Sequence, residues 1–211
     1  MKKIFIDCGT NWGQALDDFN KSHRIMDGTW DVYLFEPNPN LSGKINHHIV
    51  NKFPQLNIKF YQSAVVGANA PAEMKFMLHK QPEHKAAVGG GSTLITDDKF
   101  HEQELEGYEE VVVKTQRLTD FIMSVAEPFI EIRNGNVGHL DQSRCAIVVK
   151  LDVEGAEYEI MHDLINTGVA WWIQEVHVEF HGRRFKEDKR QEEVTLVGEL
   201  FQHGVHCFHR K

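Results

Sequence analysis

Short apolar runs alternate with helical patterns along the chain, and this order constrains the fold more than any other feature. The runs expected to form strands are residues 3–9, 31–39, 57–67, 72–80, 110–118, 145–155, 170–182 and 205–210. The patterns expected to form helices are residues 13–26, 40–53, 119–129, 156–168 and 188–204. Strands that alternate with helices predict βαβ units and a mostly parallel sheet. Because these strands are apolar nearly throughout, we expect an α/β fold with helices on both faces of the sheet.

The chain of 211 residues suits a single domain spanning residues 1–211. Its 41% hydrophobic and 26% charged residues are typical of a globular protein. The glycines at 89–91 are interpreted as a loop tip and not as a linker between domains.

The formal net charge of -8 argues against a nucleic-acid partner, because phosphate binding needs a concentrated basic surface. The basic stretch 181–190 is interrupted by acidic residues and is interpreted as solvated. Three widely spaced cysteines, Cys8, Cys145 and Cys207, suggest reduced thiols and a cytoplasmic location. No segment approaches the ~20 apolar residues that span a bilayer, so no membrane is expected. The sequence leaves monomer and homodimer open.

A glycine turn follows the first expected strand in "FIDCGTNWGQ" (residues 5–14). In open α/β sheets ligands bind outside the carboxyl ends of the strands, where glycine lets the backbone approach a ligand closely. A dinucleotide fold would need G-x-G-x-x-G, whereas Asp7, Gly9, Asn11 and Gly13 give D-x-G-x-N-x-G. An anionic pyrophosphate would be unwelcome beside Asp7, but a cationic or amino-bearing ligand would suit it. A tight turn without any ligand is the alternative.

Glu36 ends the second expected strand in "VYLFEPNP". A carboxylate at this place can accept hydrogen bonds from both ribose hydroxyls of a nucleoside. Together with Asp7, it favours S-adenosylmethionine, whose sulfonium and amino groups are cationic.

Charged residues also end the strand in "VVKLDVEGAEYEIM" (residues 148–161). Because side chains alternate along a strand, Lys150, Asp152 and Glu154 share one side until the turn at Gly155 redirects Glu154. This side can face the ligand crevice. The alternative for Lys150 is an internal salt bridge, and Glu154 is expected to stabilise the turn.

A second alternation of this kind occurs in "EVHVEFH" (residues 175–181). Glu175, His177, Glu179 and His181 lie on one side of the expected strand. So polar a face makes sense only if the strand end lines a pocket or reaches solvent. If the two strands are neighbours, Glu179 and His181 lie next to Asp152.

Four blocks of the sequence resemble the FkbM-type S-adenosylmethionine-dependent methyltransferases. They are "FIDCGTNWGQ", "LFEPNP", "SAVVG" and "VKLDVEGAEYEIM", of which K-x-D-x-E-G-x-E is the specific one. The resemblance implies a Rossmann-like class I methyltransferase fold and methyl transfer to an oxygen, often of a sugar, a glycan or a glycosylated small molecule. The end of the chain leaves little room for a seventh strand, so the sheet is expected to be abbreviated.

The resemblance also implies roles for individual residues. The methionine part of the cofactor would be held by the first turn, the ribose and its edge by the second block, and the adenine by the third. The implied cofactor-binding residues are Asp7, Gly9, Thr10, Asn11, Gly13, Glu36, Pro37, Asn38, Ser63, Ala64 and Asp152.

Two mechanisms are open on the acceptor side. In the first, Asp152 or His181 accepts the proton of the acceptor hydroxyl, with Lys150 orienting Asp152 or the substrate. In the second, Asp152, Glu179 and His181 hold Mg or Mn, which binds the hydroxyl. The glycine-rich segment 86–98 could cover the cofactor or the acceptor, or be a surface loop.

Two other functions are compatible with such a sheet. One is a nicotinamide-dependent oxidoreductase, which the missing G-x-G-x-x-G disfavours. The other is a non-catalytic nucleoside-binding module, which the presence of Lys150, Asp152, Glu179 and His181 disfavours.

Overall fold

The computed structural model describes residues 1–79, 92–94, 107–133 and 136–209, and every structural statement below concerns these residues. Their central sheet has six strands, all parallel, in the order β11-β10-β9-β1-β2-β3. The strands are β1 (Lys2–Cys8), β2 (Trp30–Phe35), β3 (Asn57–Tyr61), β9 (Cys145–Leu151), β10 (Glu175–Val178) and β11 (His206–His209). The α/β architecture and the abbreviated sheet expected from the sequence are confirmed.

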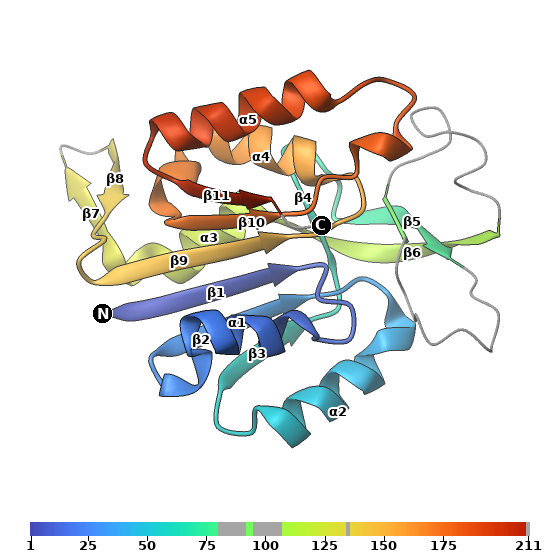
Figure 1. The fold of residues 1–211 in the computed structure, drawn as a ribbon, viewed down its shortest axis with the longest axis horizontal. Helices are drawn as coiled ribbons and strands as arrows, with labels where there is room; N and C mark the ends of the chain where they lie inside the picture. Colours follow the sequence, from blue (N-terminus) through green and yellow to red (C-terminus); the bar gives the residue numbers. More distant parts are fainter. Residues whose placement is uncertain (80–91, 95–106, 134–135, 210–211) are drawn as a thin grey trace.

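Helices cover both faces of this sheet (Figure 1). On one face lie α1 (Ala15–His23) and α2 (Ser42–Lys52), and on the other lie α3 (Leu118–Ala126), α4 (Glu157–Thr167) and α5 (Arg190–Gln202). Short 3₁₀ helices are η1 (Ile25–Asp27), η2 (Pro39–Leu41), η4 (Glu127–Phe129), η5 (Val169–Trp172) and η6 (Gly182–Arg184). Within the described residues, no helix is long and apolar enough to cross a membrane.

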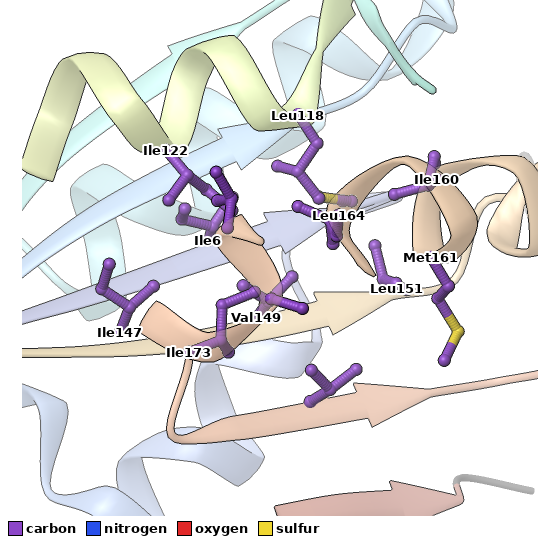
Figure 2. Packing of buried hydrophobic residues seen from close by; sticks show 14 of the residues in the cluster. Ile6, Leu118, Ile122, Ile147, Val149, Leu151, Ile160, Met161, Leu164 and Ile173 are labelled. Atoms are coloured by element: carbon purple, nitrogen blue, oxygen red, sulfur yellow. The ribbon is translucent and has the colours of Figure 1, made fainter. Parts of the chain in front are cut away.

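The core follows from the alternation of side chains along the buried strands. In β1, Phe5 packs toward α1 and α2, whereas Ile4 and Ile6 pack toward α3 and α4. Figure 2 shows this second layer, in which strand residues meet side chains of the two helices. Its labelled members include Ile6, Val149 and Leu151 from the strands, Leu118 and Ile122 from α3, and Ile160, Met161 and Leu164 from α4. Each such buried side chain contributes about 1.5–3 kcal/mol through removal from water.

A smaller sheet lies beside the carboxyl ends of the central strands (Figure 1). It contains β4 (Ala64–Val66), β6 (Tyr108–Arg117) and β5 (Glu73–His79), with β5 and β6 antiparallel. The single strand predicted at 57–67 is therefore wrong, because its first part pairs with β2 and its second part with β6. The segment 130–144, which is outside the strands and helices expected from the sequence, contains the hairpin of β7 (Ile130–Arg133) and β8 (Asn136–Leu140).

The strand predicted at 170–182 is also corrected. Gly168 ends α4 with a φ of 75°, and the chain then forms η5 before β10 begins at Glu175. Because β10 ends at Val178, Glu179 and His181 lie beyond the strand and the strict alternation of sides no longer applies to them.

The crevice at the carboxyl edge is set by the order of the strands. From β1 the chain continues to β2 and β3 on one side, and later to β9, β10 and β11 on the other. Between β1 and β9 the direction of strand addition reverses, and open α/β sheets bind ligands at such a switch point.

Candidate functional site

A pocket lies at the carboxyl ends of β1, β2 and β9, and residues of β4 and β5 complete its lining. Its empty space is about 550 Å³, including the part that is open to solvent. The lining residues are Gly9, Asn11, Glu36, Pro37, Ala64, Val65, Phe76, Ser92, Leu94, Asp152, Val153 and Glu154.

The turn after β1 is compressed against the end of β9. Gly9 has a φ of 77°, and a Cβ added there would collide with the carbonyl oxygen of Asp152. Asn11 has a φ of 53°, in the left-handed region that asparagine tolerates better than most residues. Glycine at position 9 is thus required by the approach of the two strand ends, whether or not a ligand is bound.

Glu36 lies directly after β2 at the wall of the pocket. Its Oε2 accepts the backbone N–H of Asn11 at 2.9 Å, and its Oε1 accepts that of Asn38 at 2.9 Å. Burial raises the pKa of Glu36 to about 7, although these two N–H groups favour the ionised form. The carboxylate is thus held at a known place, and each oxygen has a further lone pair for a ligand.

Asp7 does not reach the pocket in this structure. Its side chain is wholly buried, with Oδ1 3.0 Å from Nζ of Lys150 and Oδ2 accepting the hydroxyl of Thr10 at 2.7 Å. The sequence-based expectation that Asp7 faces a cationic part of the ligand is therefore corrected: the cation it faces is Lys150.

Lys150 joins the ends of β1 and β9. Besides Asp7, its ammonium lies 3.2 Å from Oδ2 of Asp152 and donates to the carbonyl of Gly9 at 2.9 Å. Burial opposes its charge, but the two carboxylates outweigh burial and keep the pKa of Lys150 above its ordinary value. Lys150 therefore agrees with both hypotheses drawn from the sequence. It forms an internal salt bridge with Asp7, and it also orients Asp152.

Asp152 is the carboxylate that the pocket presents next to the end of β1. Its side chain is 26% exposed and lines the pocket beside Gly9 and Val153. Lys150 holds one of its oxygens from behind, so the other can face a ligand.

The turn after β9 is held by Glu157 and not by Glu154, which corrects the sequence-based role of Glu154. Oε1 and Oε2 of Glu157 accept the N–H of Gly155, and Oε1 also accepts the N–H of Val153 at 3.0 Å. Glu157 is the last residue of K-x-D-x-E-G-x-E, and this position was the signal that could have identified it. Glu154 instead pairs with Arg184 at 2.5 Å.

His181 lies behind the carboxylates and does not line the pocket. Its Nδ1 is 2.9 Å from Glu157, and its Nε2 is 3.3 Å from Glu154 and 3.9 Å from Asp152. Burial lowers the pKa of His181, but the carboxylates of Glu157, Glu154 and Asp152 outweigh burial and raise it to about 9. At neutral pH the imidazolium dominates, so His181 is poorly suited to accept a proton.

The metal-ligand set expected from the sequence differs from the grouping that the fold produces. Asp152, Glu154 and His181 bring ligand atoms within 4.8 Å of one another, whereas Glu179 lies outside this group. Its Oε1 is 3.8 Å from His181 Nε2. Arg184 already pairs with Glu154, and His181 lies 3.3 Å from the same carboxylate, so Glu154 is engaged in ion pairs and does not fit an open Mg or Mn site.

Some of the other predicted cofactor residues line the pocket, and the rest lie outside its lining. Pro37 and Ala64 line the pocket, whereas Thr10, Gly13, Asn38 and Ser63 do not. Asn38 supports the second turn, because its side chain accepts the N–H of Asn40 at 3.0 Å.

No individual role was expected for three wall residues, Val65, Phe76 and Val153. Ser92 and Leu94 also line the pocket and belong to the glycine-rich segment 86–98, of which residues 86–91 and 95–98 lie outside the described residues. Phe76 had no sequence signal, because only the antiparallel pairing of β5 with β6 brings it there.

The electrostatics of the wall are one-sided. Three of its residues are carboxylates, Glu36, Asp152 and Glu154, and none of the described lining residues is basic. Carboxylate oxygens can accept hydrogen bonds from hydroxyl and amino groups of a ligand, whereas a pyrophosphate would find no basic side chain among the described lining residues.

A family model described as "Methyltransferase FkbM domain" matches residues 7–204. A crystal structure of the methyltransferase FkbM from Methylobacillus flagellatus KT is similar at 10% identity and a TM-score of 0.47. The similarity covers 93% of this chain and 37% of that protein, so this chain spans well under half of its length. No curated protein matches the chain.

Proposed function

Because the chain belongs to the FkbM methyltransferase family, we propose that it transfers the methyl group of S-adenosylmethionine to a hydroxyl group. The acceptor is a sugar, a glycan or a glycosylated small molecule. The observation that carries the choice of donor is the acidic wall of the pocket, with Glu36, Asp152 and Glu154 and no basic residue among its described members.

The pocket residues fit this donor in two respects. Glu36 lies at the end of β2, with its two oxygens held by the N–H groups of Asn11 and Asn38, where a carboxylate accepts ribose hydroxyls. Asp152 offers negative charge to the sulfonium and amino groups at the end of β1, the role that the sequence had suggested for Asp7. A dinucleotide would instead place its pyrophosphate against these carboxylates, which counts against an oxidoreductase.

S-adenosylmethionine supplies a methyl group that its sulfonium already activates, so most of the acceleration comes from holding donor and hydroxyl in line. Asp152 is the residue we assign as the proton acceptor for the hydroxyl, since it lines the pocket and His181 is protonated at neutral pH. Lys150 and His181 are positioning residues, which hold Asp152 at 3.2 Å and 3.9 Å. No step is assigned to a metal.

A second hollow next to these residues supports a sugar acceptor. Most of its lining comes from residues between 179 and 190, including Glu179, Phe180 and Phe185. Charged side chains of both signs also line it. Aromatic faces with polar neighbours suit the apolar faces and hydroxyl groups of a sugar. Through Glu179, 3.8 Å from His181, the hollow adjoins the residues around Asp152.

The test has a binding step and a transfer step. Calorimetry with S-adenosylmethionine and S-adenosylhomocysteine should show one site per chain, and NADH fluorescence should not change. Transfer of a labelled methyl group is then measured on a panel of mono- and oligosaccharides, with and without EDTA. Folded protein that binds neither compound would refute the donor. Methyl transfer to amines only would refute the hydroxyl acceptor, and binding without transfer to any acceptor would indicate a nucleoside-binding module.

A further inference from the structure

Two histidines and a glutamate meet on the face of the sheet that α1 covers, and none of them lines the pocket. Nε2 of His23 lies 2.9 Å from Oε2 of Glu175, and Nε2 of His177 lies 3.1 Å from the same oxygen. One ligand atom from each residue lies within 4.8 Å of the others. We refer to these three residues as the His23 cluster.

The fold explains why these side chains converge. His23 ends α1, which returns from the carboxyl edge of the sheet, and Glu175 begins β10. Since side chains alternate, Glu175 and His177 share the face of β10 that α1 covers. This accounts for the polar face of β10, which the ligand pocket does not use.

The cluster is partly buried and enclosed by aromatic rings. The side chains of His23 and His177 are 17% and 15% exposed. Phe19 contacts both imidazoles, Trp30 contacts His23, and Phe208 stacks on His177 at 4.7 Å. These rings restrict the two imidazoles, so their Nε2 atoms are already directed at one point before any ligand arrives.

The spacing fits a tetrahedral metal. Bonds of about 2.1 Å from zinc to imidazole nitrogen and carboxylate oxygen place neighbouring ligand atoms about 3.4 Å apart. The observed 2.9 Å and 3.1 Å need only a small outward movement of the side chains. In addition, Nδ1 of His23 lies 2.7 Å from the hydroxyl of Ser22, a contact of the kind that orients metal-binding imidazoles.

The ligand chemistry selects the metal. Two imidazoles with one carboxylate suit zinc and its neighbours in the first transition row, whereas Mg and Ca prefer oxygen ligands. Among the described residues, Glu175 forms ion pairs with these two imidazoles, whereas Glu154 beside the pocket pairs with the guanidinium of Arg184.

We propose that His23, Glu175 and His177 bind a divalent transition metal of the zinc class, which clamps the end of α1 to β10. Three protein ligands leave the fourth position to water. None of these three residues lines the pocket, so the metal site does not depend on the proposed methyl transfer and is assigned no part in it.

Cobalt and zinc are the probes that test this site. Chain freed of metal with EDTA is titrated with Co²⁺, and the visible absorption of four-coordinate cobalt is followed. We expect one equivalent to bind, Zn²⁺ to displace it, and the melting temperature to rise on binding. The band should be lost in Glu175→Gln and in His177→Asn. His162→Asn is the matched control, since His162 forms an exposed pair with Glu192 at 2.9 Å.

Several results would overturn the proposal. They are no stoichiometric binding by the folded wild type, a band that survives in both cluster variants, or a band lost in His162→Asn. A band lost in His181→Asn would assign the metal to the group of Asp152, Glu154 and His181 instead. X-ray absorption of the zinc-bound wild type gives a measurement that needs no variant, and it should show two imidazoles per zinc.

Discussion

Oδ2 of Asp152 lies 3.2 Å from Nζ of Lys150, at the point where the end of β9 meets the end of β1. This ion pair connects the wall of the pocket to a buried charge network. Lys150 is paired on its other side with Asp7, which has no exposed surface. The position of the carboxylate that we propose as the proton acceptor and the stability of the sheet thus depend on one ammonium group.

Replacement of Lys150 by methionine should leave Asp7 as an uncompensated buried charge. Breaking a buried pair in this way lowers the free energy of unfolding by about 3–5 kcal/mol. Urea unfolding of Lys150→Met, Asp7→Asn and the double variant measures the coupling. The double variant should recover most of the loss; additive losses would show that the two charges do not interact.

Asp152→Asn should lower kcat for methyl transfer by about 10²–10⁴-fold, because it removes the proton acceptor. Affinity for S-adenosylhomocysteine reports whether the pocket is intact in this variant. Glu179→Gln is the comparison, since Glu179 lies outside the group of Asp152, Glu154 and His181. Equal losses of kcat in both variants, together with inhibition by EDTA, would favour the metal ligands that the sequence suggested, Asp152, Glu179 and His181.

Glu36 should make the affinity for S-adenosylhomocysteine depend on pH. Its pKa is raised to about 7 by burial, and ribose hydroxyls donate to the ionised carboxylate. Below pH 7, Glu36 of the free protein is protonated, and this proton must leave before the ligand binds. The affinity should therefore be about tenfold weaker at pH 6 than at pH 8. Calorimetry at both pH values tests this. Glu36→Gln should bind weakly at both, and an unchanged pH profile in this variant would contradict the assignment.

Gly9→Ala should be more damaging than Gly28→Ala, although both glycines have similar φ values of 77° and 81°. A Cβ on Gly28 meets nothing within 4 Å, so only the backbone conformation opposes it, at about 1–2 kcal/mol. A Cβ on Gly9 collides with the carbonyl of Asp152 and adds about 1–3 kcal/mol. Thermal unfolding of both variants tests this prediction. Equal losses of stability in the two variants would mean that the ends of β1 and β9 can separate freely.

His181 should make the protein less stable as pH rises. Its pKa is about 9 in the folded chain and about 6.5 when unfolded, so the folded state binds the proton more tightly. The stabilisation is complete below pH 6.5 and is lost as pH rises to about 9. Urea unfolding in EDTA, compared between the wild type and His181→Asn, should show their difference shrinking over this range. Glu157→Gln should lower the pKa of His181, which NMR titration measures.

Local patterns were sufficient for part of the site. Gly9, Asn11, Glu36 and Asp152 were placed correctly at strand ends, because a turn or a strand end follows from neighbouring residues. The pairing of Lys150 with Asp7 could not be derived, since it depends on β9 lying next to β1 across more than half of the chain. The role of Glu157 was missed because its side chain turns back to N–H groups that precede it.

The sequence by itself determined the alternation of strands and helices, the parallel sheet and the acidic turns at its carboxyl edge. Those features arise from periodicity and from residues close together in the chain. Only the tertiary structure decided which carboxylate faces the pocket, which one is neutralised behind it, and that Phe76 closes the far wall. It also brought His23 to Glu175 and His177. The physical reason is that charge pairing and burial depend on distances between strands and helices, and these distances are fixed only when the core packs.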